Sequence, residues 1–166
     1  SGHNPDDYIV ERIEYKSHDG RLVPLTITRH KKTKLDGAAN LLLYGYGSYG
    51  NSMSPGFSST KFSLLDRDII WATAHIRGGM EKGMKWWKEG KLLNKKNTFQ
   101  DYISCAKFLI DKKYTSKKKI IGMGGSAGGL LMGAVVNKTP ELFLGIIMAV
   151  PFVDSLTTNL DHSLPL

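Results

Sequence analysis

The chain has 166 residues, of which 41% are hydrophobic and 23% are charged, and its formal net charge is +8. This length and composition predict one soluble globular domain with a sizeable core. No run of 18 or more apolar residues is present, and the first residues lack the pattern of a secretory signal, so neither a membrane span nor secretion is expected. A single cysteine, Cys105, excludes an internal disulfide and favours a reducing, cytoplasmic location.

Lysines supply most of the positive charge, in runs such as 31–34 and 117–119. A basic surface of this kind is compatible with a nucleic-acid footprint. The lysines are scattered over several expected loops, however, and no pattern of stacking aromatic residues interleaves with them. We therefore expect a solvated, lysine-rich surface and no nucleic-acid partner.

Two segments with alternating apolar and polar residues, 8–15 and 21–29, open the chain. They predict two strands joined by a hairpin turn at Asp19 and Gly20. Pro24 lies inside the second of these strands. Because proline cannot donate to a strand ladder, we expect this strand to be an edge strand or to carry a bulge.

The rest of the chain alternates buried strands with loops and helices. The expected elements are, in order, a strand at 40–44, a glycine- and serine-rich loop, a short helix at 57–67, a strand at 68–76, a second long loop at 77–90, a helix at 97–114, a strand at 119–123, a helix at 127–138 and a strand at 145–150. Thr98 and Asp101 predict a capping box at the start of the long helix.

An antiparallel pair followed by alternating strands and helices predicts an α/β fold. We expect a mostly parallel sheet with helices on both faces. The carboxyl ends of parallel strands meet at one edge of such a sheet, and chemistry occurs there. The three glycine-rich loops that follow residues 44, 76 and 123 should therefore gather at that edge.

Residues 120–133, IIGMGGSAGGLLMG, form a glycine-rich turn between a predicted strand and a predicted helix. Gly122, Gly124 and Ala127 match the dinucleotide pattern G-x-G-x-x-A, and helix amides at this point would suit a pyrophosphate. Against this interpretation, no acidic residue ends the next strand about 20 positions on, where a ribose contact is expected. The match also falls on a late strand, and a Walker-type loop is excluded because no Gly-Lys-Ser or Gly-Lys-Thr is present.

The same turn contains G-x-S-x-G, from Gly124 through Ser126 to Gly128. This pattern is typical of a serine held on a sharp, strained turn between a strand and a helix, and tiny residues are needed two positions to either side. Ser126 would then be a nucleophile, and the backbone amide of Ala127 would stabilise an oxyanion. From the motif alone, a purely structural glycine turn stays open as well.

Five segments extend this motif over almost the whole chain: LLLYGYGSYG, SLLDRDIIWATAHIRGGMEKGMKWW, NTFQDYISCAKFLI, GMGGSAGGLLMGAVVNKTPELF and AVPFVDSLTTNLD. Together they resemble the catalytic domain of the prolyl oligopeptidase family of serine peptidases. Ala127 after the serine and the YGYGSYG loop are similar to the oligopeptidase B (protease II) branch of that family. The resemblance implies a partial α/β-hydrolase catalytic domain over residues 1–166, which would cleave short peptides and needs no cofactor or metal.

The resemblance also implies roles for individual residues. Ser126 matches the nucleophile that is acylated, and Ala127 matches the backbone donor of the oxyanion hole. Tyr46 matches a tyrosine whose hydroxyl is the second donor, and a phenol on a loop above the sheet is chemically suited to that role. A packing aromatic in a glycine loop is the alternative for Tyr46.

The family pattern is incomplete in this sequence. Family enzymes carry Ser, Asp and His in that chain order, with the acid and base beyond the sixth core strand. The resemblance therefore implies a domain truncated after about the sixth strand, without the triad Asp and His and without the β-propeller. We expect the chain alone to be inactive. The sequence leaves open whether it is an excerpt from a longer enzyme, the product of a broken gene, or half of an assembly in which another polypeptide supplies the missing segments. The alternative is a non-catalytic remnant or binding fragment.

Cleavage after basic residues is a family expectation that this sequence does not carry itself. The acidic segment that binds a basic P1 side chain is absent, and Ser54 and Gly56 stand where a second acidic pair is expected.

The chain offers few substitutes for the missing triad members. His162 follows Ser126 by 36 residues, at a position where the resemblance suggests a polar surface, so it is not expected to be the base. Asp154 could orient a histidine, but a turn or cap after Pro151 is favoured. Without a base, a serine hydroxyl is a poor nucleophile at neutral pH. The other histidines precede the serine: His3, His18, His30 and His75.

Overall fold

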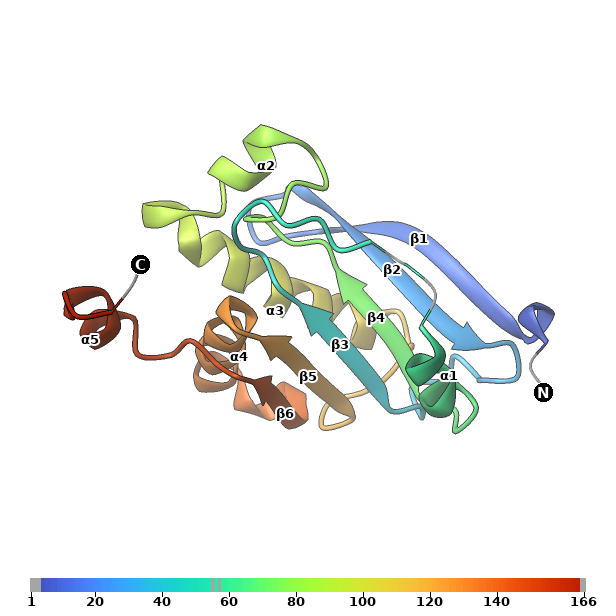
Figure 1. Cartoon of the computed structure of the whole chain (residues 1–166). Coiled ribbons are helices and arrows are strands. Elements are labelled where there is room, and N and C mark those ends of the chain that lie inside the picture. Colours follow the sequence, from blue (N-terminus) through green and yellow to red (C-terminus); the bar gives the residue numbers. More distant parts are fainter. Residues whose placement is uncertain (1–3, 55, 57, 165–166) are drawn as a thin grey trace.

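The computed structural model describes residues 4–54, 56 and 58–164. Within these residues, the strands form one sheet in the order β1-β2-β4-β3-β5-β6 (Figure 1). The first three strands in that order are antiparallel neighbours, and β4, β3, β5 and β6 are parallel. The strands are β1 (Tyr8–Lys16), β2 (Leu22–His30), β3 (Leu41–Gly45), β4 (Ile70–Ala74), β5 (Ile120–Gly125) and β6 (Phe143–Ala149). The predicted mostly parallel α/β fold is confirmed.

Helices cover both faces of the sheet, as predicted. α1 (Ser59–Leu65) packs on one face against β2 and β4, whereas α3 (Lys95–Asp111) and α4 (Ala127–Lys138) lie behind the other face in Figure 1. The remaining helical segments are the short α2 (Met84–Lys88) and α5 (Ser155–Leu160) and the 3₁₀ turns Pro5–Asp7, Leu92–Asn94 and Pro140–Leu142.

The hydrophobic core lies between the sheet and the α3–α4 layer. Alternate residues of β3, β4 and β5 enter it because successive strand side chains point to opposite faces. Fully buried members from the sheet and the two helices are Leu41, Leu43, Ile70, Ala72, Ile120, Tyr102, Leu109, Leu131 and Val135. Fixing β5 and α4 against this core also fixes the turn between them.

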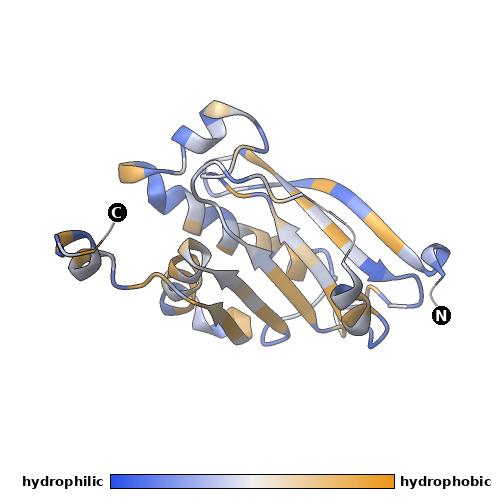
Figure 2. Cartoon of the chain, viewed as in Figure 1, coloured by the Kyte–Doolittle hydropathy of each residue, from blue (hydrophilic) through white to orange (hydrophobic). Residues whose placement is uncertain are grey.

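The β6 side of the sheet is apolar but exposed. Leu144, Ile147 and Met148 expose 58%, 44% and 44% of their surface, and Figure 2 shows hydrophobic residues along β5 and β6 at this side. Among the described strands, none pairs with the outer edge of β6.

The expectation that Pro24 marks an edge strand or a bulge is wrong. β2 lies between β1 and β4, and its pairing with β1 is regular. Pro24 lies where the β2–β4 ladder ends, and its carbonyl accepts from the amide of His75 at 2.9 Å. Proline has no N–H to return, and the carbonyl of His75 instead accepts from Nε1 of Trp86 at 3.0 Å. A side chain thus supplies the missing hydrogen bond of the ladder.

The predicted capping box is also wrong. α3 begins at Lys95, so Thr98 lies inside its first turn. Oγ1 of Thr98 donates to the carbonyls of Arg77 and Gly90, and the carboxylate of Asp101 binds Arg77. Both side chains therefore join the helix to the loop that follows β4.

Other boundaries differ less from the sequence-based expectation. The expected loop at 77–90 contains α2, and the expected helix at 57–67 forms over a shorter stretch, with Phe57 outside the described residues. The helix predicted at 127–138 coincides with α4.

Candidate active site

The loops that follow β3, β4 and β5 meet at the carboxyl edge of the sheet. The amide of Gly50 donates to the carbonyl of Gly78 at 2.9 Å, which joins the first loop to the second. A Cβ atom built on Gly128 would lie 2.9 Å from the carbonyl oxygen of Gly45 and 3.3 Å from Cδ2 of Tyr46. The β5–α4 turn therefore packs directly against the loop that carries Tyr46.

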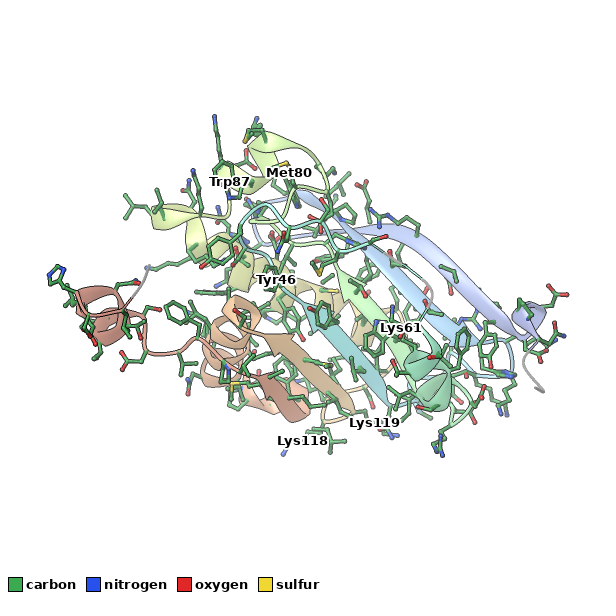
Figure 3. All side chains as sticks on the ribbon, in the orientation of Figure 1. Tyr46, Lys61, Met80, Trp87, Lys118 and Lys119 are labelled. Atoms are coloured by element: carbon green, nitrogen blue, oxygen red, sulfur yellow. The ribbon has the colours of Figure 1, made fainter. Side chains whose placement is uncertain are left out.

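Figure 3 shows Tyr46 at this edge, beneath the segment around α2 that carries Met80 and Trp87. Lys118 and Lys119 lie at the opposite edge of the sheet. This lysine run is thus separated from the candidate site.

Ser126 is the residue between β5 and α4. Its backbone angles are φ +54° and ψ −118°, a combination that L side chains rarely adopt. Its amide donates to the carbonyl of Ala149 at 2.9 Å, and its carbonyl accepts from the amides of Gly129 and Phe152 at 2.9 and 3.0 Å. The residue is exposed, and its hydroxyl has no hydrogen-bond partner among the described residues. The backbone is therefore fixed while the hydroxyl stays free.

Three glycines make this turn sterically possible. A Cβ atom on Gly124 would lie 2.3 Å from the carbonyl oxygen of Gly128, closer than real contacts allow. Gly128 itself faces Gly45 and Tyr46, as described above. Gly129, which the sequence did not single out, packs against Pro151, whose Cα would lie 2.5 Å from an added Cβ. Gly129 belongs to the run of glycines in the sequence, but nothing in that run distinguishes it from a glycine without a packing role.

Ala127 is the first residue of α4, where amides have no partner within the helix. Among the described residues its amide donates to no carbonyl. Ala127 and Phe152 also line a cavity of about 350 Å³ together with Ser48, Tyr49, Trp87 and Lys95. The free helix amide of Ala127 thus lies beside a cavity, next in the chain to the exposed hydroxyl of Ser126, and Tyr46 packs on Gly128 in the same turn of α4.

Lys95 supports the loop that carries Tyr46 and was not predicted from the sequence. Its Nζ donates to the carbonyl of Gly47 at 2.5 Å and to Oγ of Ser48 at 2.8 Å. Burial lowers the pKa of Lys95 to about 8. No local pattern distinguishes it from the neighbouring lysines, because its contacts depend on the fold.

A buried ionic cluster fixes the loop after β4. The guanidinium of Arg77 lies 2.6 Å from Asp101 of α3 and 2.6 Å from Asp19 of the β1–β2 turn. Oγ of Ser17 also donates to Asp101. Burial lowers the pKa of Arg77, but hydrogen bonds to the two carboxylates outweigh this and raise it above its usual value. The cluster joins the hairpin turn, the β4 loop and α3.

The histidines and Asp154 do not complete a triad in this structure. His75 is fully buried, with Nε2 2.8 Å from both Arg12 and Thr26. His162 is exposed, and in the described part of the chain no histidine bonds to Ser126. His3 lies outside the described residues. Asp154 caps α5 by accepting from the amide of Thr157 at 3.1 Å, which confirms its expected structural role.

Within the described ranges, no cluster of three or more His, Cys, Asp or Glu side chains suits a metal ion. Nor is any helix there long and apolar enough to cross a membrane.

Comparisons with known proteins agree with this geometry. The chain matches the prolyl oligopeptidase family over residues 55–166. It is 49% identical to dipeptidyl aminopeptidase BI of Pseudoxanthomonas mexicana over 166 residues, which cover 99% of this chain and 23% of that protein. It is also 49% identical to Protease 2 of Moraxella lacunata over 156 residues, which cover 94% and 23%.

The solved structure of oligopeptidase B from Leishmania major is similar, with a TM-score of 0.95 and 46% identity. That match covers 100% of this chain and 23% of the other. The chain thus spans 23% of the length of both curated relatives. These matches replace the dinucleotide-binding interpretation of the glycine turn. The chain belongs to the prolyl oligopeptidase family of serine peptidases, whose α/β-hydrolase fold it shares.

Proposed function

We propose that this chain is part of the catalytic domain of a serine peptidase that cleaves short peptides, with Ser126 as its nucleophile. The observation that carries the proposal is the backbone of Ser126, held at φ +54° while its hydroxyl is exposed and unbonded within the described structure. In this role Oγ attacks the scissile carbonyl, its proton passes to a general base, and an acyl-enzyme forms as the amine leaves.

The oxyanion of the tetrahedral intermediate would be stabilised by Ala127 and Tyr46. The free amide of Ala127 lies at the positive end of the α4 dipole. Tyr46 packs on Gly128, which lies in the same turn of α4 as Ala127. The loop that carries the Tyr46 hydroxyl is therefore held against the helix that follows Ser126. Removing one such donor typically lowers kcat by about 10²–10³-fold.

The proposal includes a second polypeptide segment. Among the described residues none is placed to accept the proton of Ser126, so the chain by itself lacks an activated nucleophile. We place the missing Asp and His on a segment that joins the sheet at β6, where Leu144, Ile147 and Met148 are exposed. The chain alone is then inactive, and without a complete triad only about 10³–10⁴-fold catalysis over water is expected.

Substrate preference follows the relatives. Similarity to oligopeptidase B and Protease 2 supports a peptidase of that branch of the family, and we add to the proposal the family expectation of cleavage after Arg or Lys. The equal identity to a dipeptidyl aminopeptidase supports a second candidate, removal of dipeptides from a free N-terminus. A cytoplasmic location is also part of the proposal, based on the single, buried cysteine.

Complementation tests this proposal. The chain is mixed with the part of Moraxella lacunata Protease 2 that follows the matched region, and fluorogenic substrates are added. An N-terminally blocked peptide ending in Arg reports endopeptidase activity, and a dipeptide with a free amine reports aminopeptidase activity. We expect turnover only in the mixture, abolished by Ser126→Ala and lowered about 10²–10³-fold by Tyr46→Phe.

Three outcomes oppose the proposal. Turnover by the chain alone that depends on Ser126 would contradict the need for a second segment. Turnover that survives Ser126→Ala would remove Ser126 as the nucleophile. A stable complex in which Ser126 never reacts with a fluorophosphonate would favour the alternative, a binding fragment without catalysis.

A further inference from the structure

Lys95 connects α3 to the loop that carries Tyr46. It is the first residue of α3, and its Nζ donates to the carbonyl of Gly47 and to Oγ of Ser48. Gly47 directly follows Tyr46 in the chain. The two hydrogen bonds therefore fix the peptide unit next to the proposed oxyanion donor.

The surrounding loop leaves little freedom for this peptide unit. Gly47 has φ +68°, and a Cβ atom on it would lie 2.4 Å from Cγ2 of Thr98. A Cβ atom on Gly78 would lie 2.0 Å from the carbonyl oxygen of Gly47. The carbonyl of Gly47 is thus packed between the β4 loop and α3, where Lys95 satisfies it. Without that donor, a buried carbonyl would lose a hydrogen-bond partner.

The chemical surroundings of Lys95 differ from those of the surface lysines. Its pKa falls to about 8 because it is partly buried, and among the described residues no carboxylate pairs with it. A charged group buried without a counter-ion is unfavourable unless hydrogen bonds compensate it. Its neighbour Lys96 is exposed and makes no such contacts in the described structure.

Lys95 also lies close to the proposed reaction centre. It lines the same cavity of about 350 Å³ as Ala127 and Phe152. On the other side of the loop, Tyr46 lies over the first turn of α4, with its Cα 3.5 Å from the position of an added Cβ on Gly128. The loop is therefore held between Lys95 and α4.

We propose that Lys95 is a positioning residue for the proposed peptidase reaction, whose ammonium holds Gly47 and Ser48 so that Tyr46 stays over the N-terminus of α4. The inference rests on the proposed role of Tyr46 as an oxyanion donor. It requires no contact between Lys95 and the substrate.

The first test needs no activity. The chain is labelled with 3-fluorotyrosine, the ¹⁹F signal of Tyr46 is assigned with Tyr46→Phe, and amide exchange is measured at Gly50, whose amide bonds to the β4 loop. We expect Lys95→Met to shift the Tyr46 signal and to speed exchange at Gly50 about tenfold, with the β1–β2 hairpin unchanged. Lys95→Arg should restore both readouts, and the matched control Lys96→Met should change neither.

The second test uses the complemented peptidase. Lys95→Met should lower kcat about tenfold and leave KM nearly unchanged. This loss is smaller than the loss expected when an oxyanion donor itself is removed. Lys95→Arg should recover most of the lost kcat. If Lys95→Met does not fold, Lys95→Gln takes its place in both tests.

An unchanged Tyr46 signal in Lys95→Met, or exchange that rises equally in the hairpin, would overturn the inference. If complementation gives no Ser126-dependent turnover while the Tyr46 signal still responds to Lys95, the proposed function fails and the structural link stands. The two failures are therefore distinguishable.

Discussion

Replacing Ser126 with glycine should make the fold more stable, whereas Ser126→Ala should not. Ser126 has φ +54° and ψ −118°, and its hydroxyl bonds to no other described residue. Glycine adopts such angles without a steric penalty. Alanine keeps the Cβ atom and with it the strain. The comparison of the two variants therefore isolates the strain from the loss of the hydroxyl.

The magnitude follows from two opposing terms. A residue held in a sparsely populated backbone region is destabilised by about 1–3 kcal/mol. The replacement by glycine also destabilises the fold by about 0.5–1 kcal/mol, because glycine gives the unfolded chain more conformational freedom. Ser126→Gly should therefore raise the free energy of unfolding by about 0.5–2 kcal/mol, and Ser126→Ala should stay within about 0.5 kcal/mol of the parent chain.

Urea unfolding followed by tryptophan emission measures this difference. With a slope of about 2 kcal/mol per molar urea, a gain of about 1 kcal/mol moves the midpoint by about 0.5 M. The slopes of the three proteins should agree, because the exposed surface of the unfolded chain is the same. A Ser126→Gly variant no more stable than Ser126→Ala would show that the turn holds no strain at this residue, and the reasoning above would be refuted.

Three further predictions concern the elements around the site. Gly124→Ala should cost about 1–3 kcal/mol or more in thermal unfolding, because its Cβ would meet a backbone carbonyl oxygen at 2.3 Å. Gly133→Ala in the same region, with its nearest neighbour at 3.9 Å, should stabilise the chain by about 0.5–1 kcal/mol, and equal effects would contradict the steric argument. Asp101→Asn should destabilise the chain by about 3–5 kcal/mol because it breaks a buried ion pair, whereas Asp19→Asn, more exposed, should cost at most about 1 kcal/mol in urea unfolding. The pKa of Lys95 is lowered to about 8 in the folded chain, against the usual 10.5. Between these pH values the unfolded chain binds more protons than the folded chain, so the stabilisation from a neutral Lys95 is fully present above pH 10.5 and is lost as the pH falls toward 8. The unfolding free energy should therefore rise between these pH values relative to that of Lys95→Met, and a constant difference would contradict it.

The elements that depend on local sterics could be predicted from the sequence. α4 begins where the glycine turn requires it, and the spacing of Gly124, Ser126 and Gly128 describes the turn. Gly124 is required by a contact with Gly128, four residues away, although Gly128 itself also packs against the distant Gly45. The hairpin at Asp19 and Gly20 is also local. Tyr46 needed the family resemblance, since no spacing relates it to a turn 80 positions later.

The contacts that depend on residues far apart in the sequence could not be predicted from it. Thr98 and Asp101 have the spacing of a capping box, but their partners lie in the loop after β4, which no local pattern connects to them. Lys95 differs from Lys96 in the partners that the fold brings to it, the carbonyl of Gly47 and Oγ of Ser48. Pro24 obeys the rule that proline cannot donate to a ladder, yet an internal strand tolerates it because another residue donates instead.

That substitute donor, the indole of Trp86, is also a chromophore. Trp86 is buried and bonded to the carbonyl of His75, so its emission depends on whether the loop after β4 is seated on the end of the sheet. The amide of Gly50 bonds to the same loop at Gly78. If Trp71 and Trp87 are replaced by phenylalanine, the fluorescence of Trp86 alone can therefore report, in real time and without a substrate, when the loop that carries Tyr46 separates from the loop after β4.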